Sequence, residues 1–329
     1  MGDPEYSIVI PVYDEEESLG QLFERLAELL ARLDGSAEVI LVDDGSRDSS
    51  AELIRDMTRR DSRFKLVQLS RNFGHQIALT AGTDFARGRA VIIMDADLQD
   101  PPEVILQMAE RWRQGYEVIC AVRRQRRGES AFKRGTAAFF YRAINRLSDV
   151  DMTVDVGDFR LVDRKALDAF RSMPERNRYV RGMFGWIGFR QTRVDYDRDP
   201  RYAGRTKFSV RKMVKFALDG IISFSDLPLR LALTIGFLLA VFSILGGLVA
   251  AGLKIFGAFV VPGWASIVVV TTFLGGIQLM LMGMMGQYIA RIYDEVKRRP
   301  LYLVSETHGF TEPAPVAKED LKTGLILHP

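Results

Sequence analysis

The sequence predicts an α/β fold, with a mostly parallel sheet covered by helices on both faces, followed by helices that associate with a membrane. Two observations predict this. Short apolar runs alternate with helical periodicities over the first 125 residues, and strands that alternate with helices of that length form mostly parallel sheets. The composition then changes, because residues 1–225 are rich in charges whereas Leu231–Ile289 contains only one, Lys254.

Five strands and four helices are expected in order along the first part of the chain. Each strand is a short apolar run between polar turns, and the first helix is the most regular because its leucines recur every three or four residues. The strands are expected at Tyr6–Val12, Val39–Val42, Phe64–Leu69, Ala90–Met94 and Tyr116–Val122. The helices are expected at Ser18–Leu33, Ser49–Arg60, Gly74–Ala86 and Pro102–Gln114. In such sheets, ligands bind beyond the carboxyl ends of the strands.

The second part of the chain predicts three helices at or in a membrane. Residues 209–226 carry apolar side chains on one helical face and cations on the other, which favours an interfacial amphipathic helix over a soluble helix with a solvated face. Two apolar spans within 227–291, at about 229–253 and 265–289, are each long enough to cross ~30 Å of hydrocarbon. Cations concentrate at the outer ends of these spans, so the first domain, 1–208, and the tail, 292–329, are both expected in the cytoplasm.

The composition argues against several other classes of protein. A net charge of +3 gives no indication of nucleic-acid binding. Cys120 is the one cysteine, so a disulfide framework or a cysteine zinc site is excluded and an inert, buried thiol is expected. No G-x-G-x-x-G follows the first strand, which argues against a dinucleotide-dependent oxidoreductase.

An acidic pair follows the predicted strand at 90–94. Asp95 and Asp97 flank one small residue there, and a turn can direct both side chains towards the ligand edge of the sheet. Mg²⁺ and Mn²⁺ bind through one or two carboxylates together with phosphate oxygens. The pair therefore predicts a metal–diphosphate site. Helix capping is the alternative for such acidic clusters, with Asp100 placed before two prolines.

A second acidic pair, Asp43 and Asp44, follows the strand at 39–42. A carboxylate at this position can accept hydrogen bonds from the NH of a base or from ribose hydroxyls, so the pair predicts nucleoside recognition. The alternative is a strand-to-helix turn in which Ser46 or Asp48 caps the following helix.

These clusters belong to a longer ordered set of motifs, namely Ile10–Glu16, Val42–Ser46, Ser70–Gln76, Asp95–Glu103, Arg127–Ser130, Gly157–Leu161 and Trp186–Thr192. The set resembles that of family 2 inverting glycosyltransferases with the GT-A fold. Within that family it is similar to the polyprenyl-phosphate branch, which includes dolichyl-phosphate mannose synthases, and above all to bactoprenol glucosyltransferases. The resemblance covers about residues 6–300, including the two apolar spans. Asp14 is a small departure, since many relatives carry Asn there.

The resemblance implies a reaction, its partners and its location. A hexosyl group, glucose from UDP-glucose, would be transferred to polyprenyl (undecaprenyl) phosphate by metal-dependent, inverting single displacement. The partners would be the nucleotide-sugar, the polyprenyl phosphate lipid, the membrane, and a divalent metal, Mg²⁺ or Mn²⁺. The protein would be integral to the bacterial inner (plasma) membrane, with its catalytic domain and both termini in the cytoplasm.

The resemblance also implies roles for individual residues. The nucleotide-sugar would be bound by Pro11, Tyr13, Glu15, Asp43, Asp44, Asp95, Ala96 and Gln99. The metal would be bound by Asp95, Asp97 and Gln99, and Asp97 would act in catalysis together with Asp158. Asp158 would lie beside the anomeric carbon, in the place of a general base. The acceptor phosphate would be bound by Arg123, Lys133, Arg134, Arg205 and Lys207.

The base role of Asp158 has a physical alternative. A lipid monophosphate is largely dianionic at neutral pH because its second pKa is near ~6, so no proton has to leave it. Asp158 can instead orient an arginine or a sugar hydroxyl, since general-base help matters only where a proton is transferred. Cations that neutralise and align the dianion are then expected to matter most.

The identities of the donor and the acceptor stay open on the residues alone. The donor can also be GDP-mannose, UDP-GlcNAc or a modified pentose, and the acceptor can be another lipid, such as a diacylglycerol, or a growing polysaccharide. A non-catalytic membrane scaffold is a different class, against which the intact acidic residues argue. His75 is expected to be structural, and Trp186 to be either a helix-packing residue or an aromatic platform for a sugar. Homo-oligomerisation also stays open.

Overall fold

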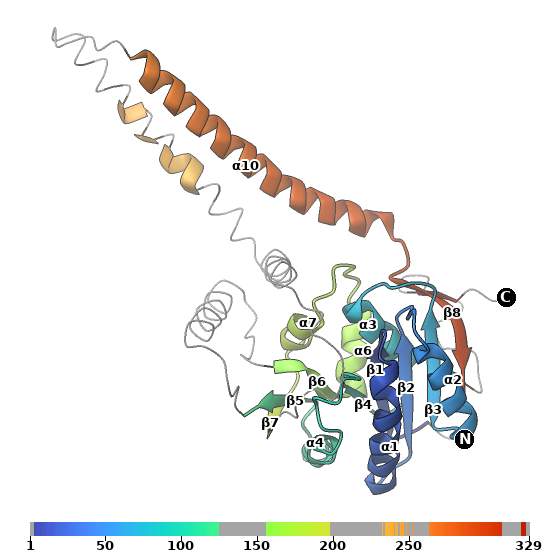
Figure 1. The fold of residues 1–329 in the computed structure, drawn as a ribbon. Coiled ribbons are helices and arrows are strands. Elements are labelled where there is room, and N and C mark those ends of the chain that lie inside the picture. The colour runs from blue at the N-terminus through green and yellow to red at the C-terminus, as the bar shows by residue number, and fades with distance from the viewer. Residues whose placement is uncertain are drawn as a thin grey trace. The chain divides into compact units, whose positions relative to one another are not determined.

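The computed structural model of the protein describes residues 3–124, 156–197 and 263–310, together with residues 324–326 and isolated helical positions between 232 and 252. The chain divides into two units. One consists of Met1–Lys215 and Arg298–Pro329, and the other of Phe216–Lys297. The first unit contains the sheet and its helices, and the second contains the long helix α10 (Figure 1).

The first unit is built on a sheet with the strand order β7-β5-β6-β4-β1-β2-β3-β8-β9. The pairs β1–β2, β1–β4, β2–β3, β5–β7 and β8–β9 are parallel, and the pairs β3–β8, β4–β6 and β5–β6 are antiparallel. The strands are β1 (Tyr6–Val12), β2 (Ala37–Asp43), β3 (Phe64–Leu69), β4 (Ala90–Ile93), β5 (Val118–Arg123), β6 (Val156–Asp163), β7 (Gln191–Tyr196), β8 (Tyr302–His308) and β9 (Gly324–Ile326). The predicted α/β fold with a mostly parallel sheet is confirmed.

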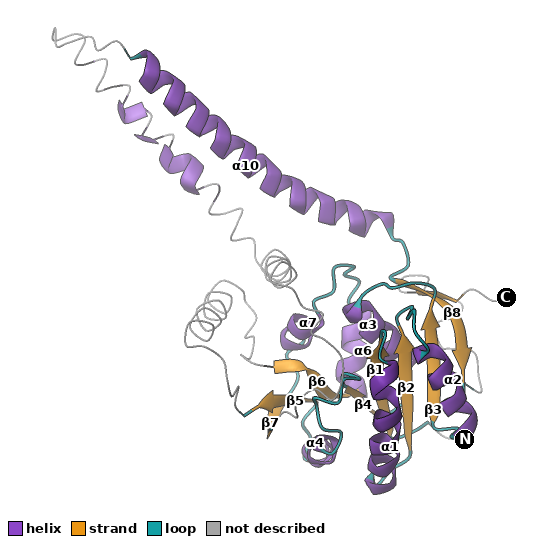
Figure 2. Cartoon of the chain, viewed as in Figure 1, coloured by secondary structure: helices purple, strands orange, loops and turns teal. Residues whose placement is uncertain are grey.

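Helices cover both faces of this sheet (Figure 2). The helices α1, α2 and α4 pack on one face and share its apolar core, whereas α3, α6 and α7 lie on the other. They are α1 (Glu16–Arg32), α2 (Ser50–Arg60), α3 (His75–Phe85), α4 (Val104–Arg113), α6 (Arg164–Ser172) and α7 (Val180–Trp186). The predicted strands β1–β5 and helices α1–α4 all occur, with ends that agree to within about two residues.

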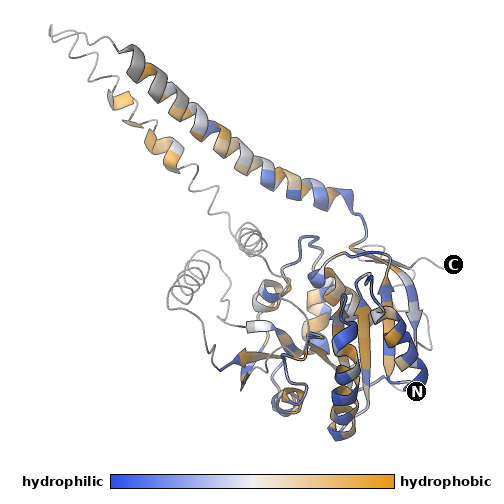
Figure 3. Ribbon diagram, in the orientation of Figure 1, coloured by the Kyte–Doolittle hydropathy of each residue, from blue (hydrophilic) through white to orange (hydrophobic). Residues whose placement is uncertain are grey.

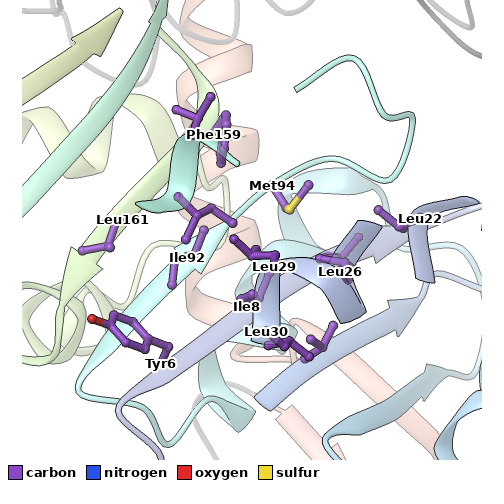
Figure 4. Packing of buried hydrophobic residues seen from close by; sticks show 14 of the residues in the cluster. Tyr6, Ile8, Leu22, Leu26, Leu29, Leu30, Ile92, Met94, Phe159 and Leu161 are labelled. Carbon is purple, nitrogen blue, oxygen red and sulfur yellow. The ribbon is translucent and has the colours of Figure 1, made fainter. Parts of the chain in front are cut away.

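The packing explains why these elements form. On one face, Leu22, Leu26 and Leu29 of α1 belong to one buried cluster with Ile8 of β1 and Ile92 of β4 (Figure 4). Full burial of such a side chain contributes roughly 1.5–3 kcal/mol, so the leucine stripe fixes the helix on the sheet.

On the other face, α3 approaches β1 and β2 closely at Gly82. A Cβ atom at this position would lie 2.3 Å from Cγ1 of Val9 and 2.9 Å from Cγ2 of Val42. Glycine therefore lets α3 lie against the two strands that end at the ligand edge of the sheet.

Four strands of the sheet, β6 to β9, were not predicted. In β6, residues 157–159 have no register partner on β4 or β5 within the described chain, because the pairing of β5 with β6 shifts between Cys120 and Val122. The irregularity interrupts the alternation of apolar and polar residues on which a strand prediction depends.

Another strand that was not predicted is β8, which pairs antiparallel with β3 and lies inside the predicted tail 292–329. That part of the tail is therefore an element of the folded unit. Tyr302 is buried and donates a hydrogen bond to Oδ2 of Asp84 at 2.9 Å, and N of Ser70 donates to O of Leu303 at 2.9 Å. Only the start of β8 is apolar, so its apolar run is too short to predict a strand.

The second unit contains α10 (Trp264–Lys297), a helix roughly 50 Å long at 1.5 Å per residue. Its part Phe273–Lys297 is the one described helix whose length and apolar composition suit a membrane crossing. Hydrophobic residues are frequent along α10, and hydrophilic residues follow towards its C-terminal end (Figure 3). The predicted span at 229–253 is described only at isolated helical positions, and the predicted helix at 209–226 lies outside the described residues, so the two-helix hairpin stays a prediction.

Candidate active site

The acidic motifs meet at one edge of the sheet because β1, β2 and β4 are parallel neighbours. β1 lies between β2 and β4, and all three strands end at the same edge. Asp43 ends β2, and Asp95 follows β4 after one residue. The strand order reverses at β1, because β2 lies on one side of it and β4 on the other, and ligands bind at such points in open α/β sheets.

The turn after β4 has a sharp backbone conformation at Leu98. Leu98 is buried and has a φ of 57°, a left-handed conformation that is unfavourable for a residue with a bulky side chain. Asp97 Oδ1 accepts a hydrogen bond from N of Gln99 at 3.2 Å. Ala96 is buried between the two carboxylates. The turn thus keeps Asp95, Asp97 and Gln99 together at the sheet edge.

Asp95 has the properties expected of a residue that binds a cation. Its Oδ1 is buried and accepts no hydrogen bond within the described chain, and Nε2 of His75 lies 3.6 Å away. Burial raises the pKa of Asp95 to about 6, although the charge of His75 lowers it. A bound cation would favour the ionised carboxylate and would occupy the unused oxygen.

The described residues contain no group of three His, Cys, Asp or Glu side chains that could hold a metal ion. Phosphate oxygens of a ligand would therefore complete the coordination of a cation at Asp95 and Asp97, as is common for Mg²⁺. The residues fit a divalent cation that binds together with a diphosphate.

The two carboxylates at the end of β2 differ in what they contact. Asp44 is buried, and its two oxygens accept hydrogen bonds from N of Phe73 at 2.7 Å and N of Gly74 at 2.9 Å. Its visible role is to hold the loop before α3. That loop crosses close to Gly45, where a Cβ atom would lie 2.6 Å from the carbonyl carbon of Arg71.

Asp43 has an oxygen to offer a ligand. Its Oδ1 accepts a hydrogen bond from N of Ser46 at 3.2 Å, whereas its buried Oδ2 has no partner within the described chain. Burial raises the pKa of Asp43, and the bonds to Ser46 only partly offset this. A buried acceptor without a donor is costly, so a ligand NH or hydroxyl at Oδ2 would be stabilising.

The loop after β1 is hydrogen-bonded to the loop after β2. N of Asp14 donates to Oγ of Ser46 at 3.0 Å, and Oδ1 of Asp14 accepts from N of Arg47 at 2.8 Å. Asp14 has a φ of 51°, a conformation that Asp and Asn tolerate better than most residues. These contacts keep Tyr13 and Glu15, with the buried Pro11 at the end of β1, beside Asp43.

Asp158 lies on β6 in an ion pair that sequence reasoning did not identify. Nε of Arg181, on α7, donates to Oδ1 of Asp158 at 2.8 Å, and Nη2 donates to Oδ2 at 3.0 Å. His75 Nε2 lies 3.2 Å from the same Oδ2. Burial alone would raise the pKa of Asp158, but the charges and hydrogen bonds of Arg181 and His75 outweigh it and hold this pKa well below the ordinary value.

His75 connects Asp158 with the acidic pair that follows β4, since its Nε2 lies near both Asp158 and Asp95. Burial would lower the pKa of His75, yet the hydrogen bond to Asp158 and the two negative charges raise it to about 9. Asp95 and Asp158 are 20 and 83 positions from His75 in the sequence, so their contacts with it could not be read from the sequence, and its expected structural role stays a prediction.

The predicted acceptor residues are only partly described. Arg123, at the end of β5, donates from Nε to the hydroxyl of Tyr196 at 3.3 Å, and Nη2 lies 3.8 Å from Oδ1 of Asp100. The Tyr196 hydroxyl also donates to Oδ1 of Asp100. Asp100 therefore holds Arg123 and Tyr196. The N-cap position of α4 is occupied by Glu103 and not by Asp100.

Arg123 also reaches the region of Asp158, since a Cβ atom at Gly157 would lie 3.6 Å from its Nη2. The remaining predicted acceptor residues, Lys133, Arg134, Arg205 and Lys207, lie outside the described residues.

The folded chain matches a known protein family over half its length. Residues 7–171 match the family model described as "Glycosyl transferase family 2", a range that contains the acidic clusters and Asp158. The chain belongs to glycosyl transferase family 2. The predicted membership is thereby confirmed, and the protein is a glycosyltransferase with a GT-A-like α/β fold.

Relatives of this glycosyltransferase align with nearly all of it. The "Uncharacterized glycosyltransferase YkcC" of Bacillus subtilis (strain 168) is 47% identical over 93% of this chain and 94% of its own. The "SfII prophage-derived bactoprenol glucosyl transferase" of Shigella flexneri is 39% identical over 92% of this chain and 98% of its own.

Among solved structures, glucosyl-3-phosphoglycerate synthase from Mycobacterium tuberculosis, in complex with Mn²⁺, uridine diphosphate and glucosyl-3-phosphoglycerate, is similar to 66% of this chain and 77% of its own. The TM-score is 0.46 and the sequence identity is 17%.

Proposed function

We propose that this family 2 enzyme transfers a hexosyl group, glucose from UDP-glucose, to polyprenyl phosphate by a metal-dependent, inverting single displacement. The name of the Shigella flexneri relative supports the lipid acceptor and the sugar. The observation that carries the proposal is the buried Oδ1 of Asp95, which accepts no hydrogen bond from the described residues and lies beside the ion pair of Asp158 with Arg181.

The nucleotide-sugar would bind along the ends of β1, β2 and β4. Asp43 offers a buried acceptor to the nucleoside, with Tyr13 and Glu15 beside it. Asp95 and Asp97, with Gln99, would hold a divalent cation. When bound, this cation neutralises the diphosphate and stabilises the charge that develops on it as the leaving group departs.

The acceptor would approach from the side of Arg123 and Arg181. A dianionic lipid phosphate needs no base, but it must be neutralised and aligned against the anomeric carbon. Asp158 is tied by two hydrogen bonds to Arg181, and its low pKa makes it a weak base. This geometry favours a role in which Asp158 orients Arg181 towards the substrates over a role as general base.

The lipid acceptor also requires contact with a membrane. The apolar helix within α10 is consistent with this, as is the predicted span at 229–253. Cations at the outer ends of the two spans support a catalytic domain on the cytoplasmic face.

A transfer assay tests the proposal. Full-length protein in detergent is incubated with undecaprenyl phosphate, Mg²⁺ or Mn²⁺, and a labelled donor chosen from UDP-glucose, UDP-GlcNAc and GDP-mannose. We expect label in the extracted lipid from UDP-glucose, with inverted anomeric configuration, and none with Asp95→Ala. Labelled lipid from another donor would correct the sugar alone, whereas absence of labelled lipid with every donor would refute the acceptor.

A further inference from the structure

The start of β6 is irregular around Asp158, the residue that forms the ion pair with Arg181. Cys120 of β5 pairs with Arg160 of β6, and the next pair is Val122 with Val156. Between these two pairs β6 advances by four residues, whereas β5 advances by only two. β4 pairs no further than Arg160. Such bulges are common beside active sites, where they redirect a side chain. Here the bulge releases Gly157 and Asp158 from the ladder, so their backbone groups need other partners.

Arg160 supplies those partners. Its Nη2 donates to the carbonyl oxygen of Gly157 at 2.9 Å, and its Nε donates to the carbonyl oxygen of Asp158 at 3.3 Å. The side chain is only 1% exposed, and Arg160 is among the largest fully buried residues of the protein. The guanidinium therefore holds the main chain of the residue that carries the Asp158 carboxylate.

The same guanidinium contacts the helix that carries the other half of the ion pair. Its Cζ lies 4.9 Å from the ring centroid of Phe184 on α7, and Arg181 precedes Phe184 by three residues, so both belong to one turn of the helix. Phe184 in turn stacks on Phe170 of α6, with centroids 4.5 Å apart and planes at 12°. Arg160 thus contacts both Asp158 and the turn that presents Arg181.

The hydrogen bonds of Arg160 to the bulge contribute to stability, but burying a cation to form them is costly. Within the described residues Arg160 forms no ion pair, and burying a guanidinium carries a desolvation cost that an apolar side chain of similar size would avoid. We infer that Arg160 is a positioning residue for sugar transfer, which aligns Asp158 with Arg181. This inference rests on the proposed function.

Arg178 provides a matched control for the test. It is also buried, also donates to backbone carbonyls, those of Met173 and Glu175, and also lies over a ring of the same aromatic stack, 4.9 Å from Phe170. None of these contacts involves Asp158 or Arg181. Arg160→Met and Arg178→Met therefore remove similar groups, although Arg178 also lies near the charge of Asp84. Only Arg160 donates to the main chain of Asp158.

The experiment compares the two variants as full-length protein in the transfer assay. For Arg160→Met we expect kcat to fall by about 10- to 100-fold, the scale of a small misplacement of reacting groups, with an unchanged KM for the donor, because the proposed nucleotide-binding residues lie at or just after the ends of β1, β2 and β4 and none lies on β6. For Arg178→Met we expect kcat near that of wild type. Arg160→Lys should restore part of the loss, since it keeps one donor but lacks the planar fork.

A double-mutant cycle separates positioning from general destabilisation. If Arg160 acts through the ion pair, adding Arg160→Met to Arg181→Met should lower kcat little further. The inference would be overturned if the fold-losses in kcat of Arg160→Met and Arg181→Met multiplied in the double variant. It would also be overturned if kcat of Arg160→Met were no lower than that of Arg178→Met. If Arg160→Met does not fold, the same cycle is run with Arg160→Lys, where a wild-type kcat would overturn it. A wild-type enzyme without transfer activity would overturn the proposed function, and the inference with it.

Discussion

Arg181 binds Asp158 in a two-pronged ion pair, with its Nε 2.8 Å from Oδ1 and its Nη2 3.0 Å from Oδ2. The Asp158 side chain is 3% exposed, whereas that of Arg181 is 33% exposed. The carboxylate is therefore enclosed and the guanidinium faces outward from it. In this arrangement the arginine is the partner that can reach a substrate phosphate.

Arg181 should consequently be indispensable for turnover. We expect Arg181→Met to lower kcat by about 10²-fold or more, the scale seen when a charge contact to a transition state is removed. Arg181→Lys should recover only part, because an ammonium cannot bind Asp158 in two-pronged fashion. Arg193→Met, which removes an exposed arginine of β7, is the control and should leave kcat unchanged. An Arg181→Met enzyme with wild-type kcat would contradict the proposed alignment.

Asp95→Ala and Asp97→Ala should each abolish transfer while the protein stays folded. Each change removes a proposed ligand of the metal and diphosphate from the edge of the sheet, where Oδ1 of Asp95 makes no hydrogen bond in the described chain. EDTA should abolish the wild-type activity in the same way, and Mg²⁺ or Mn²⁺ should restore it. Circular dichroism checks folding, and full turnover in EDTA would rule out the metal.

Arg205→Ala and Lys207→Ala should each lower kcat by about 10²-fold if these residues clamp the acceptor phosphate. The motivation is their place in a glycine-containing segment just before the predicted interfacial helix. The alternative is that they only add to the positive charge on the cytoplasmic side. Measured with saturating lipid in detergent, near-normal turnover of both variants would leave only that alternative.

Tyr302→Phe should destabilise the catalytic domain by about 1–3 kcal/mol, because Asp84 would lose a buried hydrogen-bond donor. Tyr116→Phe is the matched control, since it keeps the ring over which Arg190 lies. Denaturant unfolding of full-length protein, followed by a probe of the catalytic domain, measures both. Equal stability of the two variants would mean that the Tyr302 hydroxyl contributes nothing.

The fold was predictable where local periodicity and burial agree. The leucines of α1 recur at helical spacing, and apolar residues predominate in β1 to β4, so elements and sheet class followed from the sequence. β6 was missed because its bulge at Gly157 breaks the alternation. β8 was missed because it follows a long apolar helix and carries polar residues from Ser305 onwards.

The candidate site was predictable only for residues within short motifs. Asp43, Asp95 and Asp97 stand directly after apolar runs, and the order of parallel strands brings them to one edge. Arg181 and His75 join Asp158 from positions 23 and 83 residues away. No spacing rule connects such positions, because the crossing of α7 and α3 over the sheet decides which side chains meet.

The pairing of β8 with β3 also has a consequence for biosynthesis. A ribosome releases the residues of β1 to β7 well before those of β8, and α10 lies between them in the chain. Until residues 302–308 emerge, β3 lacks its antiparallel neighbour and presents an unpaired edge, to which other strands can add. The catalytic sheet of this enzyme can therefore be completed only after its apolar helix has been translated, so whatever receives that helix as it emerges acts on a domain whose sheet is still open at one side.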